Sequence, residues 1–98
     1  MSGPLVFVRP ARAEFDEAAE WYDQRKSGLG AAFTAAVQQS LDHICDRPLM
    51  CPVVLDDIRE ARVEGFPYSM YFRINARHIL VLAIFHDARD PSIWQDRA

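Results

Sequence analysis

The chain has 98 residues, a net charge of −3, 50% hydrophobic residues and 26% charged residues, which suits one globular domain with one core. The negative balance argues against general binding to polyanions, because nonspecific nucleic-acid binders are usually basic. No apolar run approaches the ~20 residues that span a bilayer, and residues 1–10 lack the basic start of a signal peptide, so we expect a cytoplasmic protein outside the membrane.

The first half of the chain is predicted to form a strand and two helices. Residues 5–9 are rich in β-branched and aromatic side chains, which favours a strand that stops at Pro10. Apolar residues then recur at helical spacing from Phe15 to Tyr22, which predicts a first helix. A second stripe, which includes Phe33 and Val37, predicts a helix over residues 29–46. Because the connection is very short, the two helices should form an antiparallel hairpin.

The second half is predicted to be mostly β-structure. Residues 48–57 carry prolines and aspartates and are expected to form a loop. Three strands should follow, with turns at residues 65–67 and 76–77; the strands are predicted over residues 58–64, 68–75 and 78–85. The last strand is apolar on both faces, so it should be central, and the tail from Pro91 should pack back through Trp94.

These elements predict an α+β fold in the order βααβββ, formed by a single domain over residues 1–98. The sheet would be an antiparallel β-meander with an N-terminal strand, and the helical hairpin would pack on one face. Two cysteines, Cys45 and Cys51, are expected to be free thiols that behave as small apolar groups. Together with His43 they lack a fourth ligand and a standard spacing, so we expect neither a metal ion nor another cofactor.

A titratable ring and several guanidinium groups occur around the predicted sheet. His86 follows the last strand directly, with Arg89 beyond it, and the strands before it carry Arg59, Arg62 and Arg73. The planar fork of arginine binds two oxygens of a phosphate or carboxylate at once, so these five residues are candidates for an anion site or a target-binding site.

Purely structural roles are the alternative for the same residues. His86 would then cap the strand and form a hydrogen bond to the tail. The strand arginines would form ion pairs with nearby carboxylates, namely Asp56, Asp57, Glu60 and Glu64. Two local pairs would complete this interpretation, Arg89 with Asp90 and Arg97 with Asp96.

An ordered set of local patterns carries a resemblance to a known family. Phe66-Pro67-Tyr68 precedes a Tyr-Phe-Arg strand, and the last apolar strand ends in His86 followed by Arg89, Pro91, Trp94 and Arg97. Trp21-Tyr22 lies in the first predicted helix, and Leu29-Gly30 opens the second. In this order and spacing the chain resembles the RelE/ParE family of bacterial type II toxin–antitoxin toxins, the ParE-like (plasmid stabilisation) branch in particular.

The resemblance implies a cognate antitoxin whose partly disordered C-terminal segment folds onto the toxin, in a heterotetramer or a larger assembly. Its helix would bind an apolar groove by the helical hairpin, where we expect contacts from Trp21, Tyr22, Phe33 and Val37. Core packing is the alternative role for Trp21, Tyr22 and Trp94. ParE-like members inhibit DNA gyrase, whereas RelE-like members cleave mRNA on the ribosome, and the shared fold does not choose between them.

The residues favour the gyrase inhibitor over the nuclease. RNA cleavage would use His86 as base or acid, with Arg62, Arg73 and Arg89 as phosphate clamps. However, the chain has one lysine, Lys26, and Asp87 next to His86 would repel a phosphate. An inhibitor needs no catalytic set, only a complementary surface. We therefore expect a non-enzymatic toxin, with a ribosome-dependent nuclease and a non-toxic binding module of the same fold as alternatives.

Overall fold

The computed structural model describes residues 4–98, and its elements follow the predicted order with one strand added. An N-terminal strand precedes two helices, a 3-10 turn, four strands and a last short helix. They are β1 (Leu5–Phe7), α1 (Arg9–Arg25), α2 (Leu29–Asp46), η1 (Pro48–Met50), β2 (Val53–Leu55), β3 (Ile58–Val63), β4 (Tyr68–Ile74), β5 (Ile79–His86) and α3 (Ser92–Gln95).

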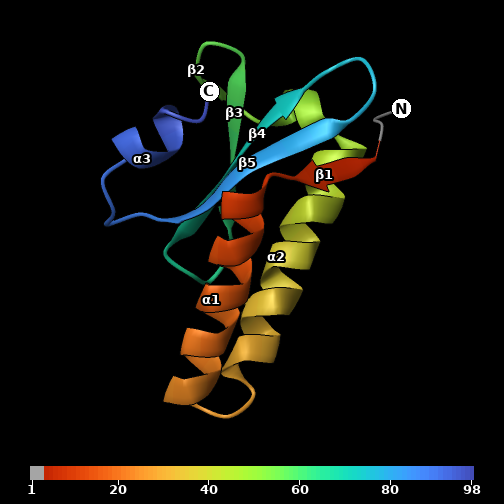
Figure 1. Ribbon diagram of the computed structural model, residues 1–98. Coiled ribbons are helices and arrows are strands. Elements are labelled where there is room, and N and C mark those ends of the chain that lie inside the picture. The colour runs from red at the N-terminus through yellow and green to blue at the C-terminus, as the bar shows by residue number, and fades with distance from the viewer. Residues whose placement is uncertain (1–3) are drawn as a thin grey trace.

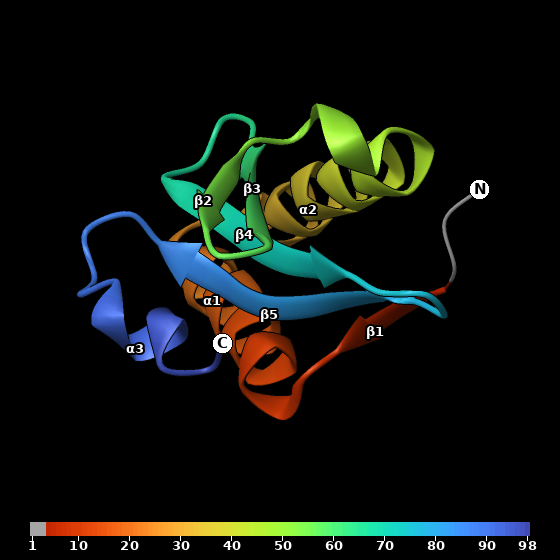
Figure 2. The same ribbon diagram turned by 90° about the horizontal axis from the view of Figure 1, so that it is seen from above.

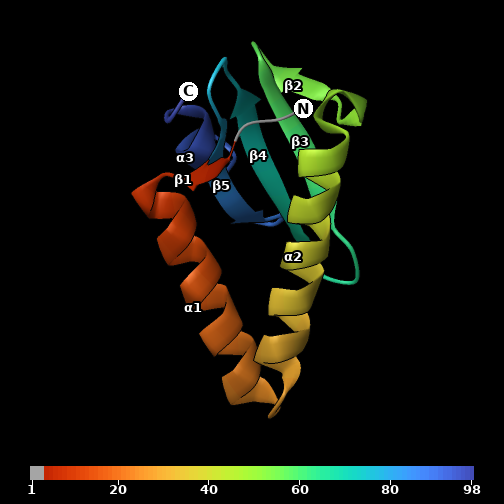
Figure 3. The same ribbon diagram turned by 90° about the vertical axis from the view of Figure 1, so that its right-hand side faces the viewer.

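The sheet has the strand order β1-β5-β4-β3-β2, so β5 lies inside the sheet between β1 and β4, and its apolar sequence predicted an inner position. Strands β2 to β5 form an antiparallel meander, and β1 pairs in parallel with the start of β5. The hairpin of α1 and α2 covers one face, and its tip extends beyond the sheet (Figures 1 and 3). Figure 2 shows α3 apart from the hairpin, beside β5. The predicted α+β fold is confirmed.

The segment 48–57 differs from the predicted loop. It contains η1 and the edge strand β2, which pairs with the beginning of β3 through Val53 opposite Arg59 and Leu55 opposite Ile58. The turn between the two strands places Asp56 at φ 50°, a left-handed conformation that Asp tolerates better than most residues. Three apolar β-formers beside an Asp-Asp turn were the signal for this hairpin, and the prolines obscured it.

Two groups of buried side chains hold the layers together. The larger one, which includes Phe33, Val37 and Phe72, fills the space between the hairpin and the sheet. The smaller one lies on the other face, where Trp94 of α3 packs against Phe85 and its ring stacks on Tyr71 with centroids 3.9 Å apart. The predicted packing role of Trp94 is thereby confirmed, because its side chain is 3% exposed.

Candidate functional site

A pocket of about 500 Å³ opens where the middle of α1 meets the start of β4 and the end of β5. Its walls combine apolar and charged side chains from these three elements, namely Glu14, Glu17, Ala18, Trp21, Tyr22, Pro67, Tyr68, Ile84, His86 and Arg89. Helical spacing places Ala18, Trp21 and Tyr22 on one side of α1, and β4 contributes Tyr68 through its first residue. We refer to this hollow as the α1 pocket.

His86 ends β5 and faces α1 across the α1 pocket. Its Nδ1 accepts a hydrogen bond from the backbone N–H of Ala88 at 3.0 Å, and its ring meets Tyr68 edge-to-face at 5.1 Å. A nitrogen that accepts a hydrogen bond carries no proton, so the remaining proton of the neutral ring lies on Nε2. This contact with the chain beyond the strand agrees with the interpretation of His86 as a strand cap.

Glu14 organises the other side of the α1 pocket, a role that no local pattern in the sequence indicated. Its carboxylate accepts from both terminal nitrogens of Arg97, at 3.0 and 2.9 Å, and from the backbone N–H of Ile84 at 3.1 Å. Arg89 donates to the same carboxylate at 3.4 Å and lies over the Phe85 ring. The predicted local pairs of Arg89 with Asp90 and of Arg97 with Asp96 are therefore wrong, since both arginines are paired with Glu14.

Hydrogen bonds from Glu14 and Arg97 satisfy backbone groups of β5 that no neighbouring strand pairs with. Strand β1 pairs only with Ile79, Leu80 and Val81, so the rest of that edge of β5 has no strand beside it. Glu14 accepts from the Ile84 N–H, and Arg97 donates to the Leu82 carbonyl at 3.0 Å. The backbone groups of a central strand must be paired when they are buried, and here an ion pair from α1 and the tail does so.

Two of the strand arginines, Arg62 and Arg73, lie on the other face of the sheet and are paired there. Arg62 forms two contacts of 2.8 Å with Asp87 and a third with Ser69, while Arg73 binds Asp57 at 2.9 Å. Hydrogen bonding from Arg62 lowers the pKa of Asp87 below its ordinary value. The ion-pair interpretation is thus confirmed for Arg73 with Asp57, whereas Arg62 takes a partner that the sequence did not suggest.

Arg59 is engaged in a different way. Its guanidinium donates to the backbone carbonyls of Cys51 at 2.6 Å and Leu49 at 3.4 Å, so it holds η1 against the beginning of β3. The predicted ion pair with a nearby carboxylate is absent among the contacts of the described residues. Cys45 and Cys51 are free thiols, and burial raises the pKa of each.

Apart from Arg59, which binds backbone carbonyls of Leu49 and Cys51, the structure divides the predicted site residues into three groups. His86 and Arg89, predicted for the target, share the α1 pocket with Trp21 and Tyr22, predicted for the antitoxin. Arg62 and Arg73 project from the opposite face, because Tyr68 and Ser69 are neighbours in β4 and point to opposite sides. Phe33 and Val37 are fully buried beneath the hairpin, so they have no surface to offer a partner in this conformation.

Trp21 is the most exposed aromatic side chain of the α1 pocket. It is 49% exposed, which differs from the core packing considered for it, whereas Tyr22 packs against Phe33 and Phe66. The guanidinium of Arg25, one helical turn later, lies 4.3 Å from the centroid of the Trp21 ring. Among residues 4–98, no cluster of His, Cys, Asp and Glu is suited to hold a metal ion, and no helix is long and apolar enough to cross a membrane.

The fold and the α1 pocket define a small α+β protein with an aromatic and charged surface beside its helical hairpin. Residues 5–91 match the family model described as the ParE toxin of the type II toxin–antitoxin system parDE, and the chain belongs to this family. The match extends over most of the chain, from β1 to the residue before α3.

A solved structure described as the chromosomal ParDE TA system from P. aeruginosa shares this fold. It superposes with a TM-score of 0.75 over 86% of this chain and 95% of that chain, at 18% sequence identity. No curated protein sequence matches this chain closely enough to count as a relative. The resemblance seen in the sequence is confirmed by the family match, and membership in a toxin–antitoxin family implies an antitoxin partner.

Proposed function

We propose that the protein is a cytoplasmic toxin that inhibits DNA gyrase by binding it, and that a cognate antitoxin neutralises this activity. One observation carries the non-enzymatic part of the proposal: each arginine of the predicted phosphate clamp is already bound within the chain. Arg62 is bound to Asp87, Arg73 to Asp57 and Arg89 to Glu14. A phosphate would have to displace a carboxylate from each of them.

The position of His86 supports the same conclusion. A nuclease must bring an acid–base group and cations to one phosphate. His86 faces α1, whereas Arg62 and Arg73 lie on the opposite face of the sheet, and only Arg89 lines the same pocket as the imidazole. The set proposed for cleavage is therefore spread over two faces, while an inhibitor needs only the surface that the α1 pocket provides.

The α1 pocket also supports a mechanism for neutralisation. Residues predicted for the target, His86 and Arg89, and residues predicted for the antitoxin, Trp21 and Tyr22, line one hollow. Exposed tryptophan is enriched among the residues that dominate binding energies, and a surface of this kind can serve both partners. We infer that the antitoxin covers the α1 pocket and thereby excludes gyrase from it.

The decisive experiment expresses the protein without antitoxin and measures two activities in parallel. We expect purified toxin to block supercoiling by gyrase and to leave mRNA intact during translation. The His86→Ala variant should keep its fold and part of its inhibition, because the imidazole transfers no proton in this mechanism and is one contact among several in the α1 pocket. Cleaved mRNA with normal supercoiling, abolished by His86→Ala, would establish the nuclease instead; absence of any growth arrest would establish a non-toxic binding module.

A further inference from the structure

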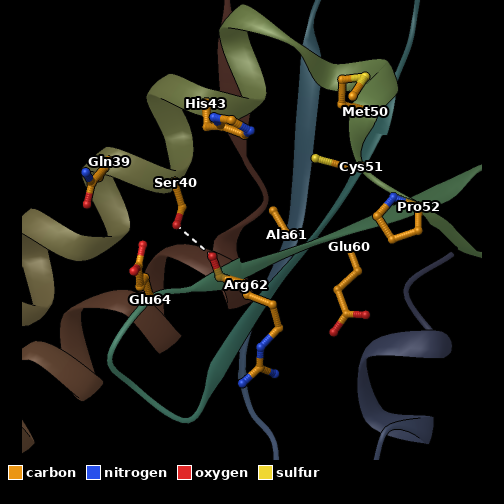
Figure 4. A pocket seen from close by; sticks show the side chains of 10 residues that line it. All are labelled: Gln39, Ser40, His43, Met50, Cys51, Pro52, Glu60, Ala61, Arg62 and Glu64. Atoms are coloured by element: carbon orange, nitrogen blue, oxygen red, sulfur yellow. Dashed lines mark hydrogen bonds between the residues drawn. The ribbon is translucent and has the colours of Figure 1, made fainter.

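Strand β2 forms one outer edge of the sheet, because it ends the strand order β1-β5-β4-β3-β2. Where β3 continues past β2, it is covered by α2: the Ser40 hydroxyl donates to the Arg62 carbonyl at 2.8 Å, drawn as a dashed line in Figure 4. Figure 4 also shows Met50 and Pro52 on the segment that leads into β2, across a hollow of about 420 Å³ from Ser40. The free backbone edge on this side of the sheet therefore belongs to β2.

Exposed apolar side chains gather on this strand and on the turn before it. Four large ones, each at least 43% exposed, lie within residues 49–54, namely Leu49, Met50, Val53 and Val54. No charged residue occurs from Pro48 to Leu55. Natural sheet edges are usually protected by charged side chains, and an apolar edge without charge favours pairing with another strand. We refer to β2 and these four side chains as the β2 edge.

The backbone of Val53 directs one donor and one acceptor out of the sheet. Val53 lies opposite Arg59 of β3. The next residue of β3, Glu60, donates its N–H to the Pro52 carbonyl at 3.0 Å, so the backbone groups of Glu60 face β2. Those of Arg59 face β4 instead, because successive residues of a strand direct their backbone groups to opposite sides. Val53 and Arg59 are thus a pair without mutual hydrogen bonds, and the N–H and C=O of Val53 point away from β3.

The neighbours of Val53 limit the length of a ladder at this edge. On one side, the N–H and the carbonyl of Cys51 are both bonded within the chain, to Pro48 and Arg59. On the other side, Leu55 leads into the turn to β3. A disordered peptide would gain few hydrogen bonds here against the free energy of ordering it. A partner that brings a strand already folded loses less conformational entropy, so the β2 edge suits a folded partner.

A second copy of this chain brings such a strand, and Val53 is complementary to itself. When two β2 strands pair in antiparallel with Val53 opposite the same residue of the other copy, each Val53 N–H donates to the carbonyl of the other. A two-fold axis then relates the copies, so the contact closes as a dimer and does not continue as a fibre. Val54 of each copy lies opposite Pro52 of the other, which places apolar side chains together on both faces of the joined sheet.

We propose that two copies of the protein associate through the β2 edge into a two-fold dimer in which the two sheets join. Each copy carries a net charge of −3, which opposes association, but the contact brings together two segments without charge. The α1 pocket stays open in this dimer, because none of the four side chains of the β2 edge lines it. The dimer therefore presents two α1 pockets and binds two sites of one partner more tightly than a single copy does.

Sedimentation velocity of the purified protein without antitoxin, over about 1 µM to 1 mM, tests the association. A contact built around one short strand is small, so we expect a weak dimer that forms toward the upper end of this range. Amide hydrogen exchange followed by NMR gives its position: the Val53 N–H should exchange more slowly as the concentration rises, whereas the amides of α1 should not change. A protein that stays monomeric at about 1 mM would overturn the proposal.

Substitutions of Val53 test the register, because the two-fold axis places this residue opposite itself. Val53→Lys brings two like charges together and should weaken the dimer at least about tenfold, and Val53→Glu should do the same. An equimolar mixture of the two variants should recover association, since a lysine of one copy then lies opposite a glutamate of the other. Val6→Lys is the matched control: Val6 is 42% exposed on β1, at the opposite edge of the sheet, and its substitution should leave the dimer intact.

The outcomes separate a second copy from other occupants of the β2 edge. Slower exchange of the Val53 N–H only after addition of the antitoxin would overturn the proposal and make the antitoxin the occupant. Weaker association of both variants without recovery on mixing would overturn the two-fold register. Should circular dichroism show that the variants are unfolded, exchange of the Val53 N–H in the unchanged protein decides. A dimer that does not inhibit gyrase would refute the gyrase inhibitor and keep the dimer.

Discussion

Glu14 holds three separate parts of the molecule, since its carboxylate contacts Ile84 of β5, Arg89 and Arg97. The Glu14 and Arg97 side chains are only 10% and 18% exposed, so their pairing takes place largely out of water. We expect Glu14→Ala to lower the free energy of unfolding by about 3 kcal/mol, because it leaves a buried guanidinium without its partner. Urea denaturation followed by circular dichroism measures this loss.

Asp16 on the same helix gives the matched control. It pairs with Arg12 at 3.3 Å, but both side chains are about 60% exposed. Exposed pairs of this kind are worth less than about 1 kcal/mol, so Asp16→Ala should change stability little. Equal losses in the two variants would show that burial of the Glu14 network does not matter.

Asp87 makes stability depend on pH. Its hydrogen bond from Arg62 lowers its pKa in the folded chain below the ordinary value of 3.8. A lowered pKa means that the pair stabilises the fold fully above the unfolded value and that this contribution is lost as the pH falls through the folded one. The stability difference between the wild type and Asp87→Asn should be constant down to about pH 5 and should shrink below about pH 4. A stability difference that stays constant to lower pH would show that the bond from Arg62 does not lower the pKa of Asp87 in the folded chain.

At the scale of the elements, the helical hairpin depends on Gly30. A Cβ atom at this position would lie 2.5 Å from the Ala19 carbonyl oxygen and 2.8 Å from the Asp23 Cβ. We expect Gly30→Ala to lower the free energy of unfolding by about 2 kcal/mol, because α1 and α2 would have to separate at this close contact. Thermal unfolding of the purified variant measures the cost.

Gly28 supplies the control for this close approach. Its φ is 89°, yet nothing lies within 4 Å of a Cβ built there, so Gly28→Ala adds only backbone strain. Asparagine tolerates this conformation, and Gly28→Asn should therefore be milder than Gly28→Ala. At Gly30, asparagine should lower stability at least as much as alanine does. A Gly30→Asn variant more stable than Gly30→Ala would mean that lack of space is not the cause of the loss.

The sequence predicted the elements whose pattern lies within a few neighbouring residues, and it missed the contacts between distant residues. The apolar stripes of α1 and α2 are local, and the second helix begins and ends at the predicted residues, 29 and 46. β2 was missed because three residues between Pro52 and Asp56 give little periodicity. The ion pair between Glu14 and Arg97 joins residues from opposite ends of the chain, so no local pattern could predict it.

The site was predicted in part for the same reason. The order from His86 to Arg97 identified the family, yet the sequence could not tell which face of the sheet each side chain occupies. Between Tyr71 and Phe72 the register against β5 shifts, with Ala83 and Val81 as partners, and this leaves Leu82 as an extra residue. A single extra residue reverses the faces on either side of it, so alternation counted along β5 fails there.

At the scale of the whole molecule, the α1 pocket joins residues from 14 to 89 and is proposed to serve gyrase and antitoxin in turn. Trp21 is the side chain that tests this sharing, because it is 49% exposed and contributes little to the core. We expect Trp21→Ala to weaken both gyrase inhibition and antitoxin binding by at least about tenfold, the loss typical of a tryptophan at the centre of an interface. Supercoiling assays and calorimetric titration with the antitoxin provide the two measurements.

Ile93 on α3 is the control, since it is apolar and 42% exposed but lies outside the α1 pocket. Ile93→Ala should leave both activities unchanged, and both variants should unfold within about 1 kcal/mol of the wild type. A Trp21→Ala variant that loses gyrase inhibition alone would show that the antitoxin neutralises the toxin from another surface. Loss of both together would mean that the antitoxin acts by occupying the surface that gyrase needs, so that release of the toxin requires only the removal of its antitoxin.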